Sequence, residues 1–140
     1  MFRVILDTNV LVAGLRSNRG ASYQLLQRVD EGSFTPVLSV PLVFEYEEVL
    51  KRQSRYLGLS HKDLEAIVDY LCDIGEHRRI FFLWRPVLPD PRDDLILELA
   101  VEAGVDGVVT FNTRDFAPAA AIDITIWTPP AFLERLGEVR

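Results

Sequence analysis

The sequence has few of the residues that cross-link or anchor a chain. Cys72 is the one cysteine among 140 residues, so an intrachain disulfide cannot form. Its place in the helical pattern "VDYLCDIG" favours a buried, unreactive thiol. The first apolar run, "FRVIL", is too short for a secretion signal or a membrane span, and there are no repeats or low-complexity tracts. We therefore expect a cytoplasmic protein without a membrane segment.

Positive charge is scarce as well. Lysine and arginine total 15 against 21 aspartates and glutamates, which gives a net charge of −6. Such a charge argues against a protein that coats nucleic acid through bulk electrostatics. It is compatible with a metal-dependent nuclease, because that kind of enzyme concentrates carboxylates where bound cations offset them.

Apolar residues, in contrast, are plentiful. They make up 49% of the chain, which is enough for a sizeable core, and the length predicts one domain over residues 1–140. Strand-like and helix-like segments alternate along the sequence, and this alternation predicts an α/β fold with a mostly parallel sheet between helices. The predicted strands are 2–6, 34–39, 106–111 and 121–127, with 79–84 as a strand or an extended connection. The predicted helices are 9–15, 21–32, 40–52, 60–75, 92–104 and 128–137.

Several acids fall where this topology brings segments together. Asp7 directly follows the first strand, and Asp115 follows the strand at 106–111 by a few residues. Asp93 and Asp94 begin the helix that leads back into that strand. All of these positions belong to the carboxyl edge of a parallel sheet, where open α/β sheets bind their ligands. The sequence therefore predicts that these carboxylates converge.

A further acid on the helix at 40–52 is ambiguous from its pattern. At about 100° per residue, Leu42 and Tyr46 belong to one apolar stripe, and Glu45 and Glu47 flank its two edges. Glu48 points away from the stripe. Periodicity alone does not choose between Glu45 and Glu47.

Clustered carboxylates are costly unless a cation separates them, since each raises the pKa of its neighbour. Mg²⁺ and Mn²⁺ prefer oxygen ligands, often a few carboxylates with waters and a substrate phosphate. Such ions activate water and stabilise the leaving oxygen during displacement at phosphorus. The ordinary alternative is that these acids are helix caps and surface charge, because a helix N-terminus favours an anion such as Asp94 in any case.

Four short motifs contain the acids described above and match those of a known family. "VILDTNVLV", "VFEYEEVL", "DPRDDLILELA" and "VVTFNTRDF" together resemble the PIN domain family, and especially the toxin components of bacterial toxin–antitoxin pairs. The resemblance runs from about residue 3 to residue 128. It implies a PIN-like three-layer α/β/α sandwich with about four or five strands, and ribonuclease activity that depends on Mg²⁺ or Mn²⁺. It also implies an RNA substrate, a possible cognate antitoxin and a homodimer.

The resemblance assigns roles to residues. The family's four acids fall on Asp7, Glu45, Asp94 and Asp115, which are expected to be the catalytic residues and metal ligands, and this favours Glu45 over Glu47. Whether Asp93 or Asp94 is the tighter ligand stays open, as does the number of metal ions. The expected supporting residues are Thr8, Asn9, Asp93, Thr110 and Asn112, with Asp90 as an extra acid. The candidate contacts for RNA phosphates are Arg16, Arg19, Arg92 and Arg114.

Two alternatives to a ribonuclease are a signalling domain and a binding module. A phosphoacceptor receiver domain also has acids at strand ends, but it carries a lysine at the end of a late strand, whereas Lys51 and Lys62 lie in or beside helical segments. A PIN fold without activity, serving as a binding module, is the second alternative. The tryptophans, Trp84 and Trp127, are expected in the core or in a dimer interface, and the apolar run 79–88 suggests burial against a second subunit.

Overall fold

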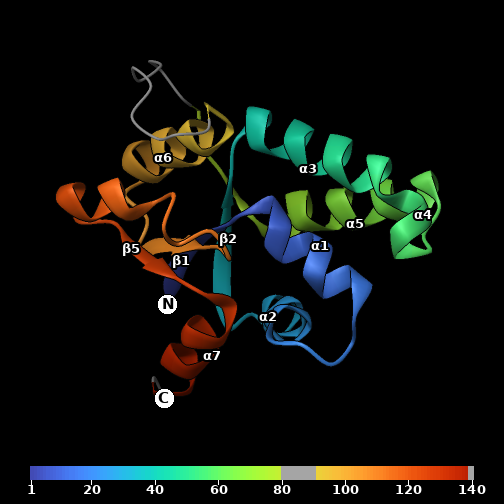
Figure 1. Ribbon diagram of the computed structural model, residues 1–140, viewed down its shortest axis with the longest axis horizontal. Coiled ribbons are helices and arrows are strands. Elements are labelled where there is room, and N and C mark those ends of the chain that lie inside the picture. Colours follow the sequence, from blue (N-terminus) through green and yellow to red (C-terminus); the bar gives the residue numbers. More distant parts are fainter. Residues whose placement is uncertain (80–90, 139–140) are drawn as a thin grey trace.

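The structure is a computed structural model that describes residues 1–79 and 91–138, the side chains of 91, 92 and 121 excepted. Within this part of the chain, five parallel strands form one sheet in the order β3-β2-β1-β4-β5 (Figure 1). The strands are β1 (Phe2–Leu6), β2 (Phe34–Leu38), β3 (Glu76–His77), β4 (Gly107–Val109) and β5 (Thr125–Trp127). The helices are α1 (Thr8–Arg16), α2 (Ala21–Asp30), α3 (Val40–Arg52), α4 (Ser54–Leu57), α5 (His61–Ile74), α6 (Pro91–Ala103), η1 (Ala117–Ile122) and α7 (Pro129–Glu138).

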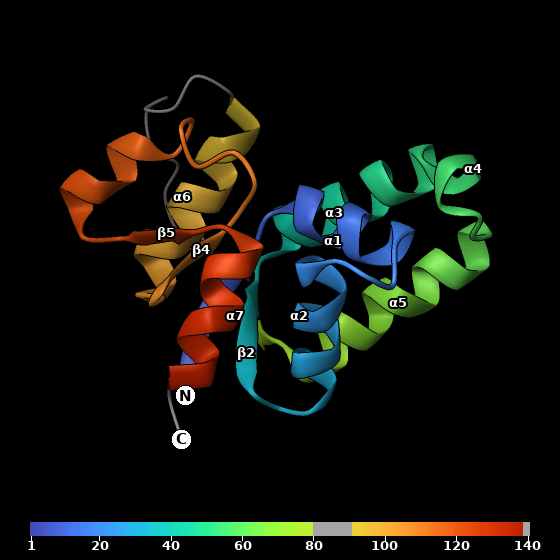
Figure 2. The ribbon, with the colours of Figure 1, turned by 60° about the horizontal axis from the view of Figure 1, so that its bottom comes forward.

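Helices cover both faces of the sheet. In Figure 2, α7 lies in front of the strands, α6 lies behind them and α2 lies beside β2; correspondingly, α2 packs on β2, α7 on β5, and α6 on β1 and β4. Helices α1, α3 and α5 lie side by side at one flank, and α4 joins α3 to α5. The five parallel strands and their helical layers confirm the predicted α/β fold. The extent of a single domain over residues 1–140 stays a prediction.

The central strand β1 determines where a ligand can bind. Val4, Ile5 and Leu6 are fully buried, and β1 pairs with β2 on one side and with β4 on the other. The chain therefore adds β2 and β3 on one side of β1, and later adds β4 and β5 on the other side of β1. Reversals of this kind open a crevice beyond the carboxyl ends of the two strands. Here those ends are Leu6 and Val109, which are register partners.

Local sequence signals account for several helix starts. Ser60 and Asp63 form a complete capping box at α5, the predicted arrangement. Ser39 Oγ accepts the amide of Leu42 at 3.3 Å at the start of α3, and Thr128 caps α7 as predicted. Strand β3 and helix α4 were not predicted. The segment expected at 79–84 lies outside the described residues except for Arg79.

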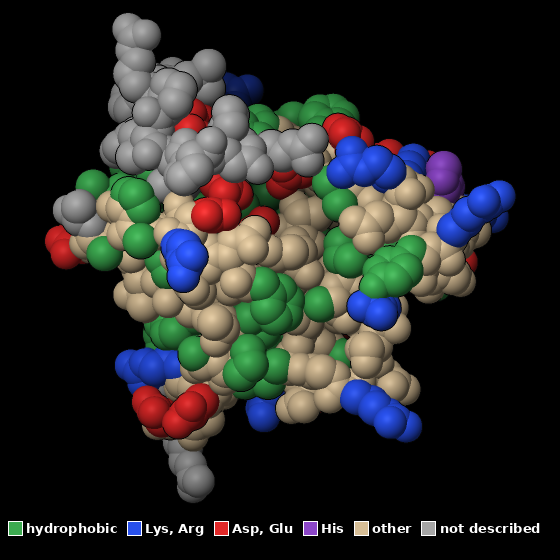
Figure 3. Space-filling model, viewed as in Figure 1, with side chains coloured by type: hydrophobic (Ala, Val, Ile, Leu, Met, Phe, Trp, Pro, Cys, Tyr) green, Lys and Arg blue, Asp and Glu red, His purple; other side chains and the backbone are tan. Residues whose placement is uncertain are grey.

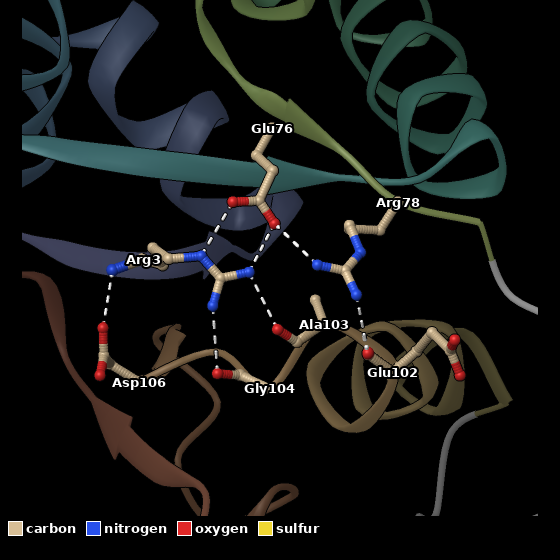
Figure 4. Close-up of polar contacts among 7 residues, drawn as sticks. All are labelled: Arg3, Glu76, Arg78, Glu102, Ala103, Gly104 and Asp106. Carbon is tan, nitrogen blue, oxygen red and sulfur yellow. Dashed lines mark hydrogen bonds and ion pairs between the residues drawn. The ribbon is translucent and has the colours of Figure 1, made fainter.

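A polar cluster at the opposite, amino edge of the sheet holds α6 in place (Figure 4). Arg3 of β1 makes two hydrogen bonds to the Glu76 carboxylate of β3, at 2.9 and 2.5 Å. The same guanidinium donates to the carbonyls of Ala103 and Gly104, at the C-terminal end of α6, at 2.9 and 3.2 Å. Arg3 thus ties two strands to the end of the helix whose first turn carries Asp93 and Asp94.

Other residues occupy structural positions. Trp127 packs against Phe2 and Phe132, with ring centroids 5.8 and 5.0 Å apart, as expected for a core residue, whereas Trp84 lies outside the described residues. Cys72 is half-buried, and burial, followed by the charges of Asp69 and Asp73, raises the pKa of its thiol. Among the described helices, none has the length and apolar character needed to cross a membrane.

Candidate active site

A cavity of about 340 Å³ opens at the carboxyl edge of the sheet. Its acidic lining residues are Asp7, at the end of β1, Glu45, on α3, and Asp93, in the first turn of α6. Figure 3 shows several Asp and Glu side chains near the upper centre of one face, with Lys and Arg side chains spread around the margins. Three acids that are far apart in the sequence therefore share one cavity.

Asp7 is held on both its backbone and its side chain. Its amide donates to the carbonyl of Val109 at 2.9 Å, which joins the ends of β1 and β4. The residue is 7% exposed, and its carboxylate accepts the hydroxyl of the fully buried Thr110 at 2.7 Å. The amide of Asn112 donates to that same hydroxyl oxygen at 3.0 Å. This chain of hydrogen bonds fixes the direction in which Thr110 donates, and so fixes one carboxylate oxygen of Asp7.

Glu45 is positioned in an equivalent way. Its carboxylate accepts the hydroxyl of Thr8, in the first turn of α1, at 2.8 Å, so a threonine hydroxyl supports each of the two acids. Glu47, its rival in the helical pattern, instead forms an ion pair with Lys51 at 2.8 Å. The structure thus places Glu45, and not Glu47, at the cavity.

Tyr46 links the two segments that carry these acids. It is 1% exposed, and its hydroxyl donates to the carbonyl of Leu6 at 2.6 Å. Burial, followed by the charges of Asp7 and Glu45, raises the pKa of Tyr46 well above its ordinary value of 10.0. Tyr46 therefore stays a neutral donor at neutral pH, and its hydrogen bond ties α3 to the end of β1.

The remaining predicted residues divide into two groups. Asn9, Asn112 and Arg16 line the cavity together with the residues above, and the Asn9 side-chain oxygen accepts the amide of Phe111 at 3.5 Å. The described residues that lie outside its lining are Asp94, which is 5% exposed, Asp115, which is half-buried, and Arg19 and Arg114, which are exposed. Asp90 and the Arg92 side chain lie outside the described part of the chain.

Some lining residues were missed from the sequence. Arg52, Gln53 and Tyr56 come from the end of α3 and from α4, and Phe111 follows β4. Arg52 and Tyr56 carry no pattern that separates them from ordinary surface positions. Phe111 did carry a signal, because a large apolar residue at the end of a predicted strand and beside polar motif residues is a candidate for exposure at the site.

Comparison with known proteins decides the family. A model of the PIN domain matches residues 3–114, which is most of the chain. The chain belongs to the PIN domain family. PIN domains are nucleases, which places this PIN domain among phosphodiester hydrolases at that coarse level, and PIN nucleases in general use divalent metal ions.

A solved structure shares the fold. A chain in the crystal structure of VapBC2 from Rickettsia felis, bound to a DNA fragment from their promoter, superimposes with a TM-score of 0.61 and 14% sequence identity. The match covers 89% of this PIN domain and 98% of that chain. At this identity the likeness concerns the fold alone. Comparison with curated proteins gives no match.

Proposed function

We propose that the protein is an endoribonuclease that cuts single-stranded RNA with the help of Mg²⁺ or Mn²⁺, and that it acts as the toxin of a toxin–antitoxin pair. The observation that carries this proposal is the convergence of Asp7, Glu45 and Asp93 on one cavity at the switch point of a parallel sheet. Membership of a nuclease family supports it.

The donor atoms around the cavity fit a hard divalent ion. Carboxylate oxygens are the ligands that Mg²⁺ and Mn²⁺ prefer, and Mg²⁺ is often bound through one or two carboxylates plus waters and substrate phosphate. Within the described residues, no three Asp, Glu, His or Cys side chains are close enough to enclose an ion. An ion bound here would therefore need waters and a substrate phosphate to complete its coordination. When bound, the ion would supply charge neutralisation and an activated water.

The side chains of the protein would then hold the ion and orient the oxygens that bind it. Asp7 and Glu45 would contribute oxygens whose directions are set by the hydroxyls of Thr110 and Thr8. Asp93 and Asp94 share the first turn of α6, where the helix N-terminus favours negative charge. We propose that Asp93 is the tighter ligand of this pair because it lines the cavity. Asp94 and Asp115 stay predicted ligands.

The proposal is tested by cleavage of a labelled single-stranded RNA with Mn²⁺ and with a chelator. We expect cleavage by the wild type only with metal. Asp7→Asn should lose activity by orders of magnitude, since it keeps the shape and removes a ligand charge. Asp69→Asn is the matched control, because Asp69 is exposed on α5, and it should cleave like the wild type. Equal activity of the Asp7 and Asp69 variants would contradict the proposal.

Parallel substitutions distinguish the neighbouring acids. If Asp93 is the ligand, Asp93→Asn should reduce cleavage more strongly than Asp94→Asn at a fixed, limiting Mn²⁺ concentration. Raising the metal concentration should recover part of the Asp93→Asn loss, because a weakened site is filled by mass action. The opposite ranking would assign the role to Asp94.

The protein is proposed to bind two protein partners, a cognate antitoxin and a second copy of itself. The solved structure with the shared fold is a VapBC2 toxin–antitoxin complex bound to promoter DNA, which supports a cognate antitoxin for this chain as well. We propose that the toxin acts in the cytoplasm, where its RNA substrate is, and that it forms a homodimer. Sedimentation at micromolar concentration should give the mass of a dimer; a monomer alone would remove that claim without affecting the catalytic one.

A PIN fold that binds without cutting is the second candidate. Such a module would show no change in melting temperature on titration with Mg²⁺ or Mn²⁺. It would also bind RNA or protein equally well in chelator. The receiver alternative is not retained, because the chain belongs to the PIN domain family.

A further inference from the structure

Arg16 and Phe111 lie between two cavities. Both residues, with Ala13, line the acidic cavity described above. The same three residues line a second cavity of about 500 Å³, which extends over the α1–α2 loop and the start of α7 to Gly20, Ser22 and Pro130. The two cavities therefore adjoin, and a ligand that leaves the acidic cavity toward the second one passes Arg16 and Phe111.

Phe111 is unusually exposed for a large apolar residue at the end of a buried strand. Thr110 before it is fully buried, whereas 49% of Phe111 is accessible. Its amide makes a long hydrogen bond, 3.5 Å, to the side-chain oxygen of Asn9, which also lines the acidic cavity. An accessible aromatic ring next to a phosphodiesterase site is suited to stacking on an unpaired base.

Arg16 supplies positive charge at the same place. It lies in the last turn of α1, and its guanidinium carbon is 4.5 Å from the centroid of the Tyr56 ring. That contact holds the side chain against the cavity wall and leaves the charge uncompensated. Among the described residues Arg16 forms no ion pair with an acid, whereas Arg52, on the same wall, pairs with Glu48. Arg16 can therefore bind a phosphate.

The length of α1 separates this position from the acids. Arg16 is eight residues beyond Thr8, which corresponds to about 12 Å along a helix. With its guanidinium held against Tyr56 at this end of α1, Arg16 is placed for the phosphate of a neighbouring nucleotide rather than for the one beside Asp7 and Glu45. The order along the wall is acids, then Phe111 and Arg16, then the second cavity.

We propose that Phe111 and Arg16 form a nucleotide-binding subsite that stacks an unpaired base and binds a phosphate next to the scissile one. The proposal rests on the proposed nuclease function, and it adds the direction in which the RNA strand leaves the acidic cavity. It also predicts a preference for single strands, because a base paired within a duplex cannot stack on a protein ring.

The test measures binding of a fluorescent 12-nucleotide single-stranded RNA in an Asp7→Asn host, which keeps the RNA intact. Phe111→Ala should raise Kd roughly 5- to 150-fold, and Phe111→Trp should restore binding. Arg16→Gln should weaken binding and lower the slope of log Kd against log salt by about 0.7. The Phe111 variant should leave that slope unchanged, because a phenyl ring releases no counterions.

Matched controls separate the subsite from general surface effects. Phe44, on α3, is 67% exposed and Arg28 lies on α2, and neither lines the two cavities. Phe44→Ala should bind like the host, and Arg28→Gln should keep the salt slope. A double-stranded RNA of the same sequence should bind the Phe111→Ala variant and the host equally.

The outcomes separate this proposal from the nuclease proposal. The subsite proposal is overturned if Phe111→Ala leaves the RNA affinity unchanged, or if Phe44→Ala loses as much affinity as Phe111→Ala. Either result overturns it even if the protein with Asp7 intact cleaves RNA. Phe111 would then be a candidate contact for a protein partner. Specific loss of binding in Phe111→Ala supports the subsite, even if the intact protein shows no cleavage. Failure of the host to bind the 12-nucleotide RNA at all overturns it as well.

Discussion

Replacing Tyr46 by phenylalanine removes a hydroxyl that ties α3 to the end of β1. The hydroxyl donates to the Leu6 carbonyl at 2.6 Å, in a place where the tyrosine is 1% exposed. Phenylalanine fits the same space, but the buried carbonyl loses this donor. An acceptor left without its partner in the interior costs about 1–3 kcal/mol of unfolding free energy. For a chain of this length, that corresponds to roughly 3–10 °C in melting temperature.

The assay is reversible denaturant unfolding at neutral pH, followed by circular dichroism. Tyr70→Phe is the matched control: Tyr70 is 42% exposed and its hydroxyl bonds to Asp30 at the surface, so its loss should change the unfolding free energy by less than about 0.5 kcal/mol. The Tyr46 variant should also cleave RNA more slowly, because Leu6 precedes Asp7 and Tyr46 follows Glu45. An unfolding free energy equal to that of the wild type would refute the assigned role of this hydrogen bond.

Two further predictions concern stability. The pKa of Glu76 is lowered, chiefly by its hydrogen bond with Arg3, so this stabilisation is present above the unfolded pKa near 4.5 and is lost as the pH falls through the folded value. Glu76→Gln should therefore be less stable than the wild type at pH 7, and the difference in unfolding free energy should shrink by pH 3; a constant difference would contradict this. Gly107→Ala places a Cβ 2.4 Å from a backbone oxygen and 2.5 Å from the Trp127 ring. This crowding should lower the free energy of unfolding by about 1–3 kcal/mol, measured by thermal unfolding. Gly137→Ala is the control: the new Cβ has open space around it, and the substitution should be neutral or slightly stabilising.

Most of the fold was predictable because its elements carry strong local signals. The buried run before Asp7, the Ser60–Asp63 capping box and the glycine that ends α6 all agree with the structure. Strand β3 was missed because two residues, Glu76 and His77, contain no apolar alternation, and they join the sheet through backbone pairing with β2. Tertiary contact, and not local pattern, determines such a short edge strand.

The site was predictable in its location and less so in its details. Topology alone indicated the shared edge for Asp7 and the acids of α6. The helical pattern could not choose between Glu45 and Glu47, because the choice depends on Thr8 and Lys51, which contact them from elsewhere in the fold or helix. The Tyr46 hydrogen bond to Leu6 joins residues 40 positions apart. Contacts of that kind leave no periodic trace in the sequence.

The central claim is that acids around the cavity bind a catalytic divalent ion, and it is tested most directly by melting wild type and Asp7→Asn in chelator and in millimolar Mn²⁺. In chelator, the variant should be as stable as the wild type or more stable, because one repelling charge is removed. At 100 times its Kd, Mn²⁺ should stabilise the wild type by about 2.7 kcal/mol, and the variant should gain less. If Asp7 is only a helix cap, Asp7→Asn would change stability equally with and without Mn²⁺, and metal would shift both melting temperatures by the same amount; that result would contradict the account.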